Sequence, residues 1–429
     1  IINTASYVRL ISSKVFGTIY GGGNGAYDYS SSAGVLRAYP IGATKNDANL
    51  LAQVSTSKAT YPSVCATGVS VEGGHILKDL YGGGNKATVG SDSKHSPSYI
   101  LMGKTVLGNN EYPGNPQIDG RVFAGGRMAD VYGSMDVMVN NGMVINEFYA
   151  GNDISGKVVG SDRAQSILGS AFPAGWGTAL KGDHNAFDGT LLTSNNANVY
   201  VRVCEGTQIG TIYGGGNGDY TYEVDGLIVT AKDAHDNVLG IFSSNALDDD
   251  DKVNEVKPFQ SETWLDIAGN VTTAIYGGGN AAGVNRSHVN VMGDAHVGTA
   301  SELAAIYGGC KSANVTYNTT VKLDKKDDHT PIVEGNVFGG CDISGNVGLI
   351  PSLTDHSKDL DVNAVRGNAT LLNSKEFAHV IINDATVTGR VFGGGNGLES
   401  ARGVSYGAVA APTGDAPNEK YVYASGDNS

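Results

Sequence analysis

One short phrase recurs nine times along the chain and constrains its fold more than any other feature. The phrase is an aliphatic residue or Phe, then an aromatic residue, then a run of small residues. Full copies occupy Ile19–Asn24, Leu80–Asn85, Ile212–Asn217, Ile275–Asn280 and Val391–Asn396, and variants begin at Val122, Phe148, Ile306 and Val337. Such internal periodicity predicts a repeat architecture, in which each unit packs on its neighbours.

The spacing of the aromatic residues gives the length of one repeat. The step from Tyr276 to Tyr307 equals the step from Tyr307 to Phe338, whereas the other steps are unequal and mostly longer. These values predict a coil of about 31 residues, with loop insertions or an unmarked coil in the long gaps. Two longer stretches also recur: residues 7–29 align with 200–222, and residues 153–158 align with 342–347.

Short strand-like runs fill the shortest repeat. Residues 287–293 alternate apolar and polar side chains, residues 296–298 form a second run and residues 304–308 a third, separated by Gly, Asn and Asp. This pattern predicts an all-β chain, a right-handed parallel β-helix (β-solenoid) with long loop insertions. We expect one such helix over residues 1–396. Residues 397–429 are expected to form a further coil or a partly ordered tail of a longer protein.

The positions before each aromatic residue predict which side chains face the core. The residue directly before is always apolar, and the fifth before is usually aliphatic, as in Ile76, Val144 and Val271. Strict alternation then places the aliphatic side chains inside and the aromatic ones outside, unless the glycines bend the strand. The closing Asn is expected to stack on its counterparts and to occupy a left-handed corner.

The composition of the chain limits the kinds of molecule that it is expected to bind. The chain has 62 Gly but only 11 Pro, and 43 acidic against 29 basic residues give a formal net charge of −14. This charge argues against nucleic acids and anionic membrane surfaces, which select basic patches. No stretch of about 18 apolar residues is present, so no membrane-spanning segment is expected.

The aromatic column is the candidate binding feature. Tyr20, Tyr81, Tyr213, Tyr276 and Tyr307 are the candidate ligand-binding residues. An outward row of rings can stack on sugar faces, or it can simply stabilise neighbouring coils. The mixture of Tyr with Phe123, Phe338 and Phe392 favours the stabilising role, because a dedicated site would need the hydroxyl.

Other candidate sites are weaker. The glycine runs lack the Gly-Lys-Ser/Thr that follows in a phosphate loop. Asp248 to Asp251 is expected to form a solvated loop, with calcium binding as an open alternative. Cys310 and Cys341 lie one repeat apart and are expected to be stacked free thiols. Asp183-His184, in an insertion that also contains Trp176, is the one pairing that suggests a site. We assign no catalytic residue, no metal ligand and, apart from the open calcium question, no cofactor.

The Ile-Tyr-Gly-Gly-Gly-Asn phrase and the acidic, Gly- and Asn-rich composition resemble large bacterial cell-surface β-helix proteins of the adhesin type. The resemblance implies export to the cell surface or medium, and contact with glycans or surface proteins. The expected function is a non-enzymatic structural or adhesive module whose insertions (26–70, 91–117, 159–197, 218–262 and 348–378) carry recognition, with end-to-end self-association as a further interaction. The alternative is a polysaccharide lyase or glycoside hydrolase with a groove along one face.

Overall fold

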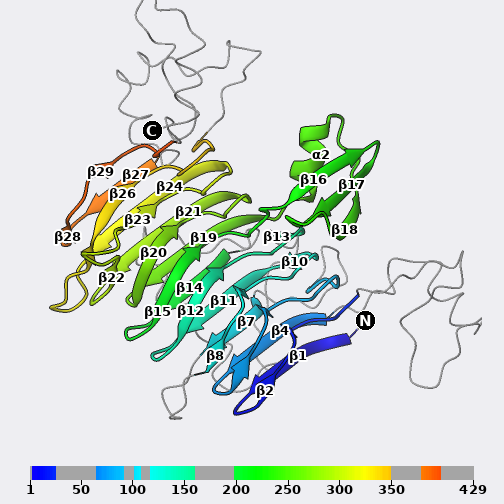
Figure 1. The fold of residues 1–429 in the computed structure, drawn as a ribbon, viewed down its shortest axis with the longest axis horizontal. Helices are drawn as coiled ribbons and strands as arrows, with labels where there is room; N and C mark the ends of the chain where they lie inside the picture. Colours follow the sequence, from blue (N-terminus) through cyan, green and yellow to red (C-terminus); the bar gives the residue numbers. More distant parts are fainter. Residues whose placement is uncertain are drawn as a thin grey trace, which may run out of the picture.

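The chain is all-β, with two large parallel sheets and one short helix, in a computed structural model that describes residues 2–25, 64–90, 101–107, 116–159, 198–348 and 378–397 (Figure 1). Nine successive segments, here called passes, each place a strand in the first sheet and then one or two strands in the second. Every pass pairs in parallel with the pass before it, so the expectation of parallel strands is confirmed.

The first sheet has eleven strands. They are β1 (Ile2–Leu10), β4 (Val64–Val71), β7 (Leu101–Leu107), β10 (Val131–Tyr132), β11 (Ser134–Val139), β13 (Lys157–Val159), β14 (Asn198–Val203), β19 (Phe259–Ile267), β21 (Gly283–Met292), β24 (Val315–Asp324) and β27 (Ala378–Ile382).

The second sheet has fifteen strands, because most passes cross it in two short pieces. They are β2 (Lys14–Val15), β3 (Ile19–Tyr20), β5 (His75–Ile76), β6 (Leu80–Tyr81), β8 (Gln117–Ile118), β9 (Val122–Phe123), β12 (Val144–Tyr149), β15 (Gln208–Tyr213), β20 (Asn270–Tyr276), β22 (His296–Val297), β23 (Ala304–Tyr307), β25 (Ile332–Val333), β26 (Gly335–Phe338), β28 (Thr386–Val387) and β29 (Val391–Phe392).

A small antiparallel sheet stands beside the two large ones (Figure 1). In the chain it is inserted between the fifth and the sixth pass. It consists of β16 (Thr221–Asp225), β17 (Ile228–Lys232) and β18 (Val238–Ser243), with α2 (Asp249–Val256) lying against β16 and β17. We call residues 219–257 the lobe.

The long spacings between aromatic residues hold insertions and no unmarked pass. Tyr20 pairs directly with Tyr81, and Tyr149 pairs directly with Tyr213, although both spacings are about twice the length of one repeat. Tyr276 pairs in the same way with Tyr307, across the shortest complete repeat. Of the two explanations for the long gaps, loop insertion is therefore the correct one.

The apolar residue before the aromatic one is buried in the first eight passes, as predicted, and Val391 of the ninth pass is 47% exposed. Leu80, Ile212 and Ile275 are fully buried and belong to one apolar cluster that runs through all the passes. The fifth position before the aromatic holds another core residue in most passes, but Val144 is 57% exposed and Ile145 takes its place. The reason is that β12 lacks the extra residue that other passes have between these two inward positions, as between Ile76 and Leu80 or between Val271 and Ile275.

The closing Asn stacks along the sheet axis, as expected. Asn85 Nδ2 donates to Asn24 Oδ1 at 2.8 Å, and Asn280 Nδ2 donates to Asn217 Oδ1 at 3.0 Å. The left-handed corner, however, falls on the residue that follows. Gly25 and Gly218 have φ of 58° and 65°, and no Asn of the described chain has a positive φ.

The glycine run is required because successive passes approach closely. A Cβ on Gly277 would collide with the Gly308 carbonyl, and one on Gly308 with the Gly339 carbonyl. Glycine allows this close approach in most passes, whereas the third and fourth passes place Ala124 and Ala150 at the same position.

The two duplicated stretches of sequence share one offset in the structure. Residues 7–29 include the first pass and residues 200–222 the fifth, whereas residues 153–158 follow the fourth pass and residues 342–347 the eighth. Both duplications therefore relate passes that are four apart, so passes 1–5 correspond to passes 5–9.

Candidate functional site

The aromatic residues of the nine phrases form one continuous column of stacked rings. Neighbouring ring centroids are 4.5 to 5.0 Å apart and the ring planes deviate by 4° to 11°. The structure thus brings all five predicted binding residues, Tyr20, Tyr81, Tyr213, Tyr276 and Tyr307, into one column.

The column is separate from the aliphatic core, but it is not an open strip. Tyr81 is 1% exposed and Tyr307 is 7% exposed, while Tyr20 in the first pass is half-buried. The expectation of an outward-exposed row is therefore wrong for the inner rings. Both faces of each inner ring are covered by the rings of the neighbouring passes, so a sugar has no free face there on which to stack.

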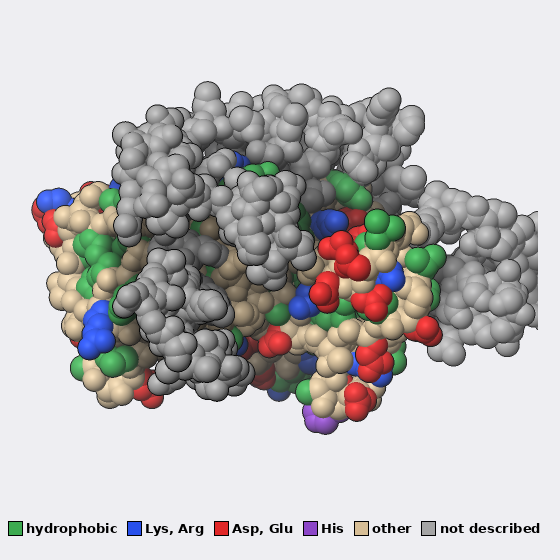
Figure 2. All heavy atoms as spheres, turned by 90° about the horizontal axis from the view of Figure 1, so that it is seen from above, with side chains coloured by type: hydrophobic (Ala, Val, Ile, Leu, Met, Phe, Trp, Pro, Cys, Tyr) green, Lys and Arg blue, Asp and Glu red, His purple; other side chains and the backbone are tan. Residues whose placement is uncertain are grey.

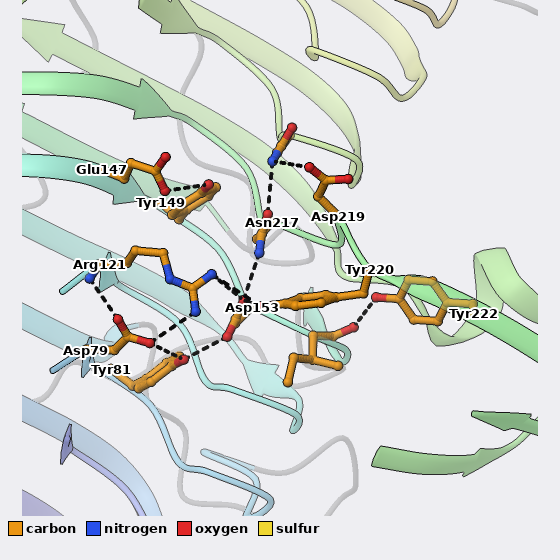
Figure 3. Close-up of polar contacts among 12 residues, drawn as sticks. Asp79, Tyr81, Arg121, Glu147, Tyr149, Asp153, Asn217, Asp219, Tyr220 and Tyr222 are labelled. Carbon is orange, nitrogen blue, oxygen red and sulfur yellow. Dashed lines mark hydrogen bonds and ion pairs between the residues drawn. The ribbon is translucent and has the colours of Figure 1, made fainter. Parts of the chain in front are cut away.

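A buried carboxylate, Asp153, ties the edge of this column to its surroundings (Figure 3). Asp153 is 1% exposed. It accepts hydrogen bonds from the Tyr81 hydroxyl at 2.7 Å, from Asn217 Nδ2 at 2.9 Å and from the Tyr220 hydroxyl at 2.7 Å. These donors come from the second pass, the fifth pass and the lobe, so one side chain connects three distant parts of the chain.

Arg121 supplies the positive charge of this cluster. Its guanidinium lies 3.6 Å from Asp153 Oδ1 and 3.1 Å from Asp79 Oδ2, and it also donates to the Tyr220 hydroxyl at 3.2 Å. Burial disfavours the charged guanidinium, but Asp153 and its neighbours outweigh that effect and raise the pKa of Arg121. The arginine is also placed over the Phe123 ring, 5.0 Å from its centroid, in a cation–π contact.

The tyrosines of the cluster are held in the neutral form. Burial, followed by the charge of Asp153, raises the pKa of Tyr81 far above its ordinary value. Burial, followed by Glu147, does the same for Tyr149, whose hydroxyl donates to Glu147 Oε2 at 3.2 Å. These phenols are hydrogen-bond donors and are not poised as bases.

Asp342 repeats the role of Asp153 four passes later. It accepts a hydrogen bond from the Tyr276 hydroxyl at 2.9 Å and one from Asn396 Nδ2 at 3.0 Å. As with Asp153, the tyrosine comes from two passes earlier and the asparagine from the next pass. Arg121 has no equivalent here, because Ala305 occupies the corresponding place before the aromatic residue.

Two carboxylates of the cluster flank one oxygen atom. The Tyr81 hydroxyl lies 2.7 Å from Asp153 Oδ2 and 3.3 Å from Asp79 Oδ2. Retaining glycosidases also place two carboxylates, about 5–5.5 Å apart, on either side of an oxygen, but that oxygen belongs to the substrate. Here the oxygen belongs to the chain itself, and Asp153 is buried with its oxygens occupied by side chains. The arrangement is a closed structural network.

A second row of polar and aromatic residues, which the sequence analysis missed, lies on the outward face of the first sheet, where its side chains are nevertheless buried: Tyr200 is 0%, Trp264 5% and His288 4% exposed. The register places Tyr200, Trp264 and His288 side by side on β14, β19 and β21. Trp264 and His288 stack with centroids 3.9 Å apart, and His288 Nε2 lies 2.9 Å from Glu262 Oε1.

The same face carries an ion pair. Arg202 donates to both carboxylate oxygens of Asp136 at 2.8 Å. The signal for this row is present in the sequence as aromatic and charged residues at the outward positions of strands. Its members, from Asp136 to His288, are spread over four passes, and only the strand register brings them together.

The lobe is attached to the sheets by two tyrosines. The Tyr220 hydroxyl reaches Asp153, and the Tyr222 hydroxyl donates to the Ile154 carbonyl at 2.6 Å (Figure 3). Met128 and Ile154 form an apolar cluster with Ala231 of the lobe. The lobe is therefore fixed to the passes by both hydrogen bonds and apolar packing.

The acidic run Asp248 to Asp251 is solvent-exposed, as predicted, but it is not a loop. Asp248 is the N-cap of α2, its side chain accepting from the Asp251 backbone N–H at 2.9 Å, and the next three aspartates form the first turn. Acidic residues stabilise this end of a helix because it carries the positive end of the helix dipole. Within the described ranges, no group of three or more His, Cys, Asp and Glu is arranged to hold a metal ion.

The two cysteines in equivalent repeat positions are free thiols, as expected. Cys310 and Cys341 are fully buried, and each Sγ lies 3.4 Å from a backbone carbonyl, of Ala282 and Ala313 respectively. Burial raises the pKa of Cys341 to about 12 and that of Cys310 well above its ordinary value. Reactive thiolates at neutral pH are therefore not expected at either position.

Several sequence candidates fall outside the described residues: Asp183, His184, Trp176, the side chain of Cys65, most of the insertions other than 218–262, and the tail beyond residue 397. No helix in the described portion of the chain is both long and apolar enough to cross a membrane. No protein-family model, no curated protein and no solved structure matches this chain.

Proposed function

We propose that the chain is a right-handed parallel β-helix that acts as a non-enzymatic structural or adhesive module at the bacterial cell surface or outside the cell. The adhesin-type resemblance of the repeat phrase supports the location. The parallel pairing of all nine passes and the single aromatic column support the helical architecture.

One observation carries the adhesive role: the polar side chains along the aromatic column bond to one another, whereas exposed apolar side chains gather on the lobe. Asp153 is surrounded by Tyr81, Asn217 and Tyr220. By contrast, Ile241 and Leu247 of the lobe are 65% and 98% exposed. Apolar groups that a protein leaves in water mark an interaction surface more often than a structural one.

The test is adhesion with and without the lobe. In the variant, residues 218–258 are replaced by Ala-Ala. The same two residues join Asn280 to Gly283 in the next pass, and Gly283 pairs with Phe259, the first residue after the deletion. Immobilised wild-type and variant proteins are compared for binding to glycan arrays and to extracellular-matrix proteins, with circular dichroism to establish that the sheets persist. Binding that requires the lobe supports the proposal, and absence of binding by the wild type to every surface contradicts it.

The second candidate is a polysaccharide-cleaving enzyme, favoured by the outward row of the first sheet. Trp264 stacks on His288, which lies beside Glu262, so an aromatic ring and two titratable groups meet at one place, with Trp264 and His288 only 5% and 4% exposed. The assay is release of reducing ends or unsaturated sugars from a polysaccharide panel, with Glu262→Gln and His288→Ala as variants. Activity that both variants abolish would establish the enzyme and overturn the adhesive role as the primary one.

A further inference from the structure

The lobe has one face against the passes and one face in water. Val229 and Ala231 on β17 are fully buried, whereas Ile228 on the opposite face of the same strand is 41% exposed. On β18, Val238 and Ile241 are 56% and 65% exposed. The outward face of this three-stranded sheet therefore presents branched aliphatic side chains to solvent.

One edge of the same sheet is open. β18 pairs with β17 on one side, and no backbone hydrogen bond of the described chain uses its other side. The opposite edge strand, β16, lies beside α2. Proteins usually protect a free edge with charged residues or proline, but β18 reads Val-Leu-Gly-Ile-Phe-Ser and contains neither.

The negative charge of the lobe favours a positively charged partner for this edge. Residues 219–257 contain ten Asp and Glu against three Lys, a net charge of −7, which is half of the −14 of the whole chain. Glu223 on this face is already paired with Lys232. Asp225 lies across from Ile228, and Asp236 stands two residues before β18, so two further carboxylates border the aliphatic face and its open edge. Figure 2 shows acidic side chains gathered toward one end of the surface in view, with hydrophobic side chains among them.

We propose that the lobe binds an extended segment of another protein by strand addition to β18, and that this segment alternates lysine or arginine with aliphatic residues. The main chain of the segment pairs with the open edge. Its aliphatic side chains continue the face of Ile228 and Ile241, and its cationic side chains meet the surrounding carboxylates. A second copy of the chain is disfavoured, because two lobes of charge −7 repel each other.

This inference rests on the proposed adhesive role and names the partner chemistry of the lobe. The probe is a fluorescein-labelled peptide of about eight residues that alternates lysine and valine, titrated with the full chain and followed by fluorescence anisotropy. The matched control peptide alternates glutamate and valine. Ile241→Ser tests the aliphatic face, and Asp225→Asn with Asp236→Asn tests the charge; all three positions are exposed, and circular dichroism reports whether each variant keeps its sheets.

The lysine–valine peptide is expected to bind, to lose at least tenfold in affinity with Ile241→Ser and with the double charge variant, and to weaken as salt is raised. Two further probes carry N-methyl groups on every valine or on every lysine, which blocks one backbone edge of the peptide or the other. One of them is expected to lose binding. Equal binding of both methylated peptides, binding of the glutamate peptide, or an unchanged affinity of Ile241→Ser would overturn the inference. The glycan-binding and sugar-release assays above do not use these peptides. A failure of the proposed function can therefore be told apart from a failure of the lobe to bind the lysine–valine peptide.

Discussion

Asp153 and Asp342, which follow the fourth and the eighth pass, make the same pair of hydrogen bonds: each accepts from a tyrosine two passes earlier and from an asparagine in the next pass. They differ in two respects: Asp153 also accepts from the Tyr220 hydroxyl, and the charge compensation is not the same. Asp153 faces Arg121, whereas no lysine or arginine of the described ranges lies within ion-pair distance of Asp342. The two copies therefore allow the same contact to be measured with and without a neighbouring cation.

Asp153→Asn is expected to destabilise the chain by about 2–3 kcal/mol, because it leaves the Arg121 charge only partly compensated. Asp342→Asn, which breaks hydrogen bonds but strands no cation, is expected to cost about 1–2 kcal/mol. Urea unfolding followed by circular dichroism measures both. The exposed Asp250→Asn serves as the control and should change stability by less than about 0.5 kcal/mol. Equal losses for Asp153 and Asp342 would show that neither Arg121 nor the Tyr220 bond adds to stability at Asp153.

Tyr213→Ala is expected to remove about 3–5 kcal/mol of stability, because it opens a gap between two stacked rings. Tyr213→Phe keeps the ring and should cost less than about 1 kcal/mol, whereas Tyr81→Phe also loses the bond to Asp153 and should cost about 1–2 kcal/mol. Thermal and urea unfolding give the comparison. If Tyr213→Phe were as damaging as Tyr213→Ala, the ring stack would not be the stabilising element.

The sequence predicted the aromatic column well, because a repeated phrase reports directly on strands that pair in register. The phrase also identified the inward aliphatic residues, such as Leu80 and Ile275. It could not show that the rings are covered, since burial depends on the next pass and on residues far away, such as Tyr220 against Asp153. Nor could it place Val144, because the extra residue between the two inward positions of a pass shows only in the register with the neighbouring passes.

Gly308→Ala is expected to destabilise the chain by about 3 kcal/mol, since the new Cβ would collide with the Gly339 carbonyl. Gly393→Ala, at the same position of the last described pass, meets no described atom within 4 Å and should change stability by less than about 0.5 kcal/mol. The difference between the urea midpoints of the two variants measures how much stability depends on the close approach of successive passes. A similar loss at both positions would mean that backbone freedom, and not contact, requires the glycine.

Stability is expected to fall as the pH rises above about 10, the ordinary pKa of tyrosine. Burial raises the pKa of Tyr81, Tyr149 and Tyr276 in the folded chain, so above this pH the unfolded chain has lost protons that the folded chain retains. The free energy of unfolding therefore decreases with pH in this range. During an alkaline titration, the phenolate absorbance of these residues should rise only when the circular dichroism signal of the folded chain is lost. Ionisation of these tyrosines while the chain stays folded would contradict the prediction.

In a Cys65→Ser background, a thiol reagent at neutral pH is expected to modify Cys204 before Cys310 or Cys341. Burial raises the pKa of all three thiols, but Cys204 is partly exposed whereas Cys310 and Cys341 are fully buried. Reaction of the buried pair should require unfolding and follow its rate. Mass spectrometry of peptides at timed intervals identifies the order, and early modification of Cys310 would show that the pair is accessible in the folded chain.

The bonds of Asp153 and Asp342 skip a pass, and this changes how the chain should come apart. In an ideal repeat array each unit is coupled only to its neighbours, so fraying can stop after any unit. Here Tyr81, Asp153 and Asn217 clamp the second to fifth passes, and Tyr276, Asp342 and Asn396 clamp the sixth to ninth. Under a mechanical load along the axis, the chain would then yield as the first pass and two blocks of four, with the short pairing of β13 with β19 as the skipping contact that crosses the boundary between the blocks.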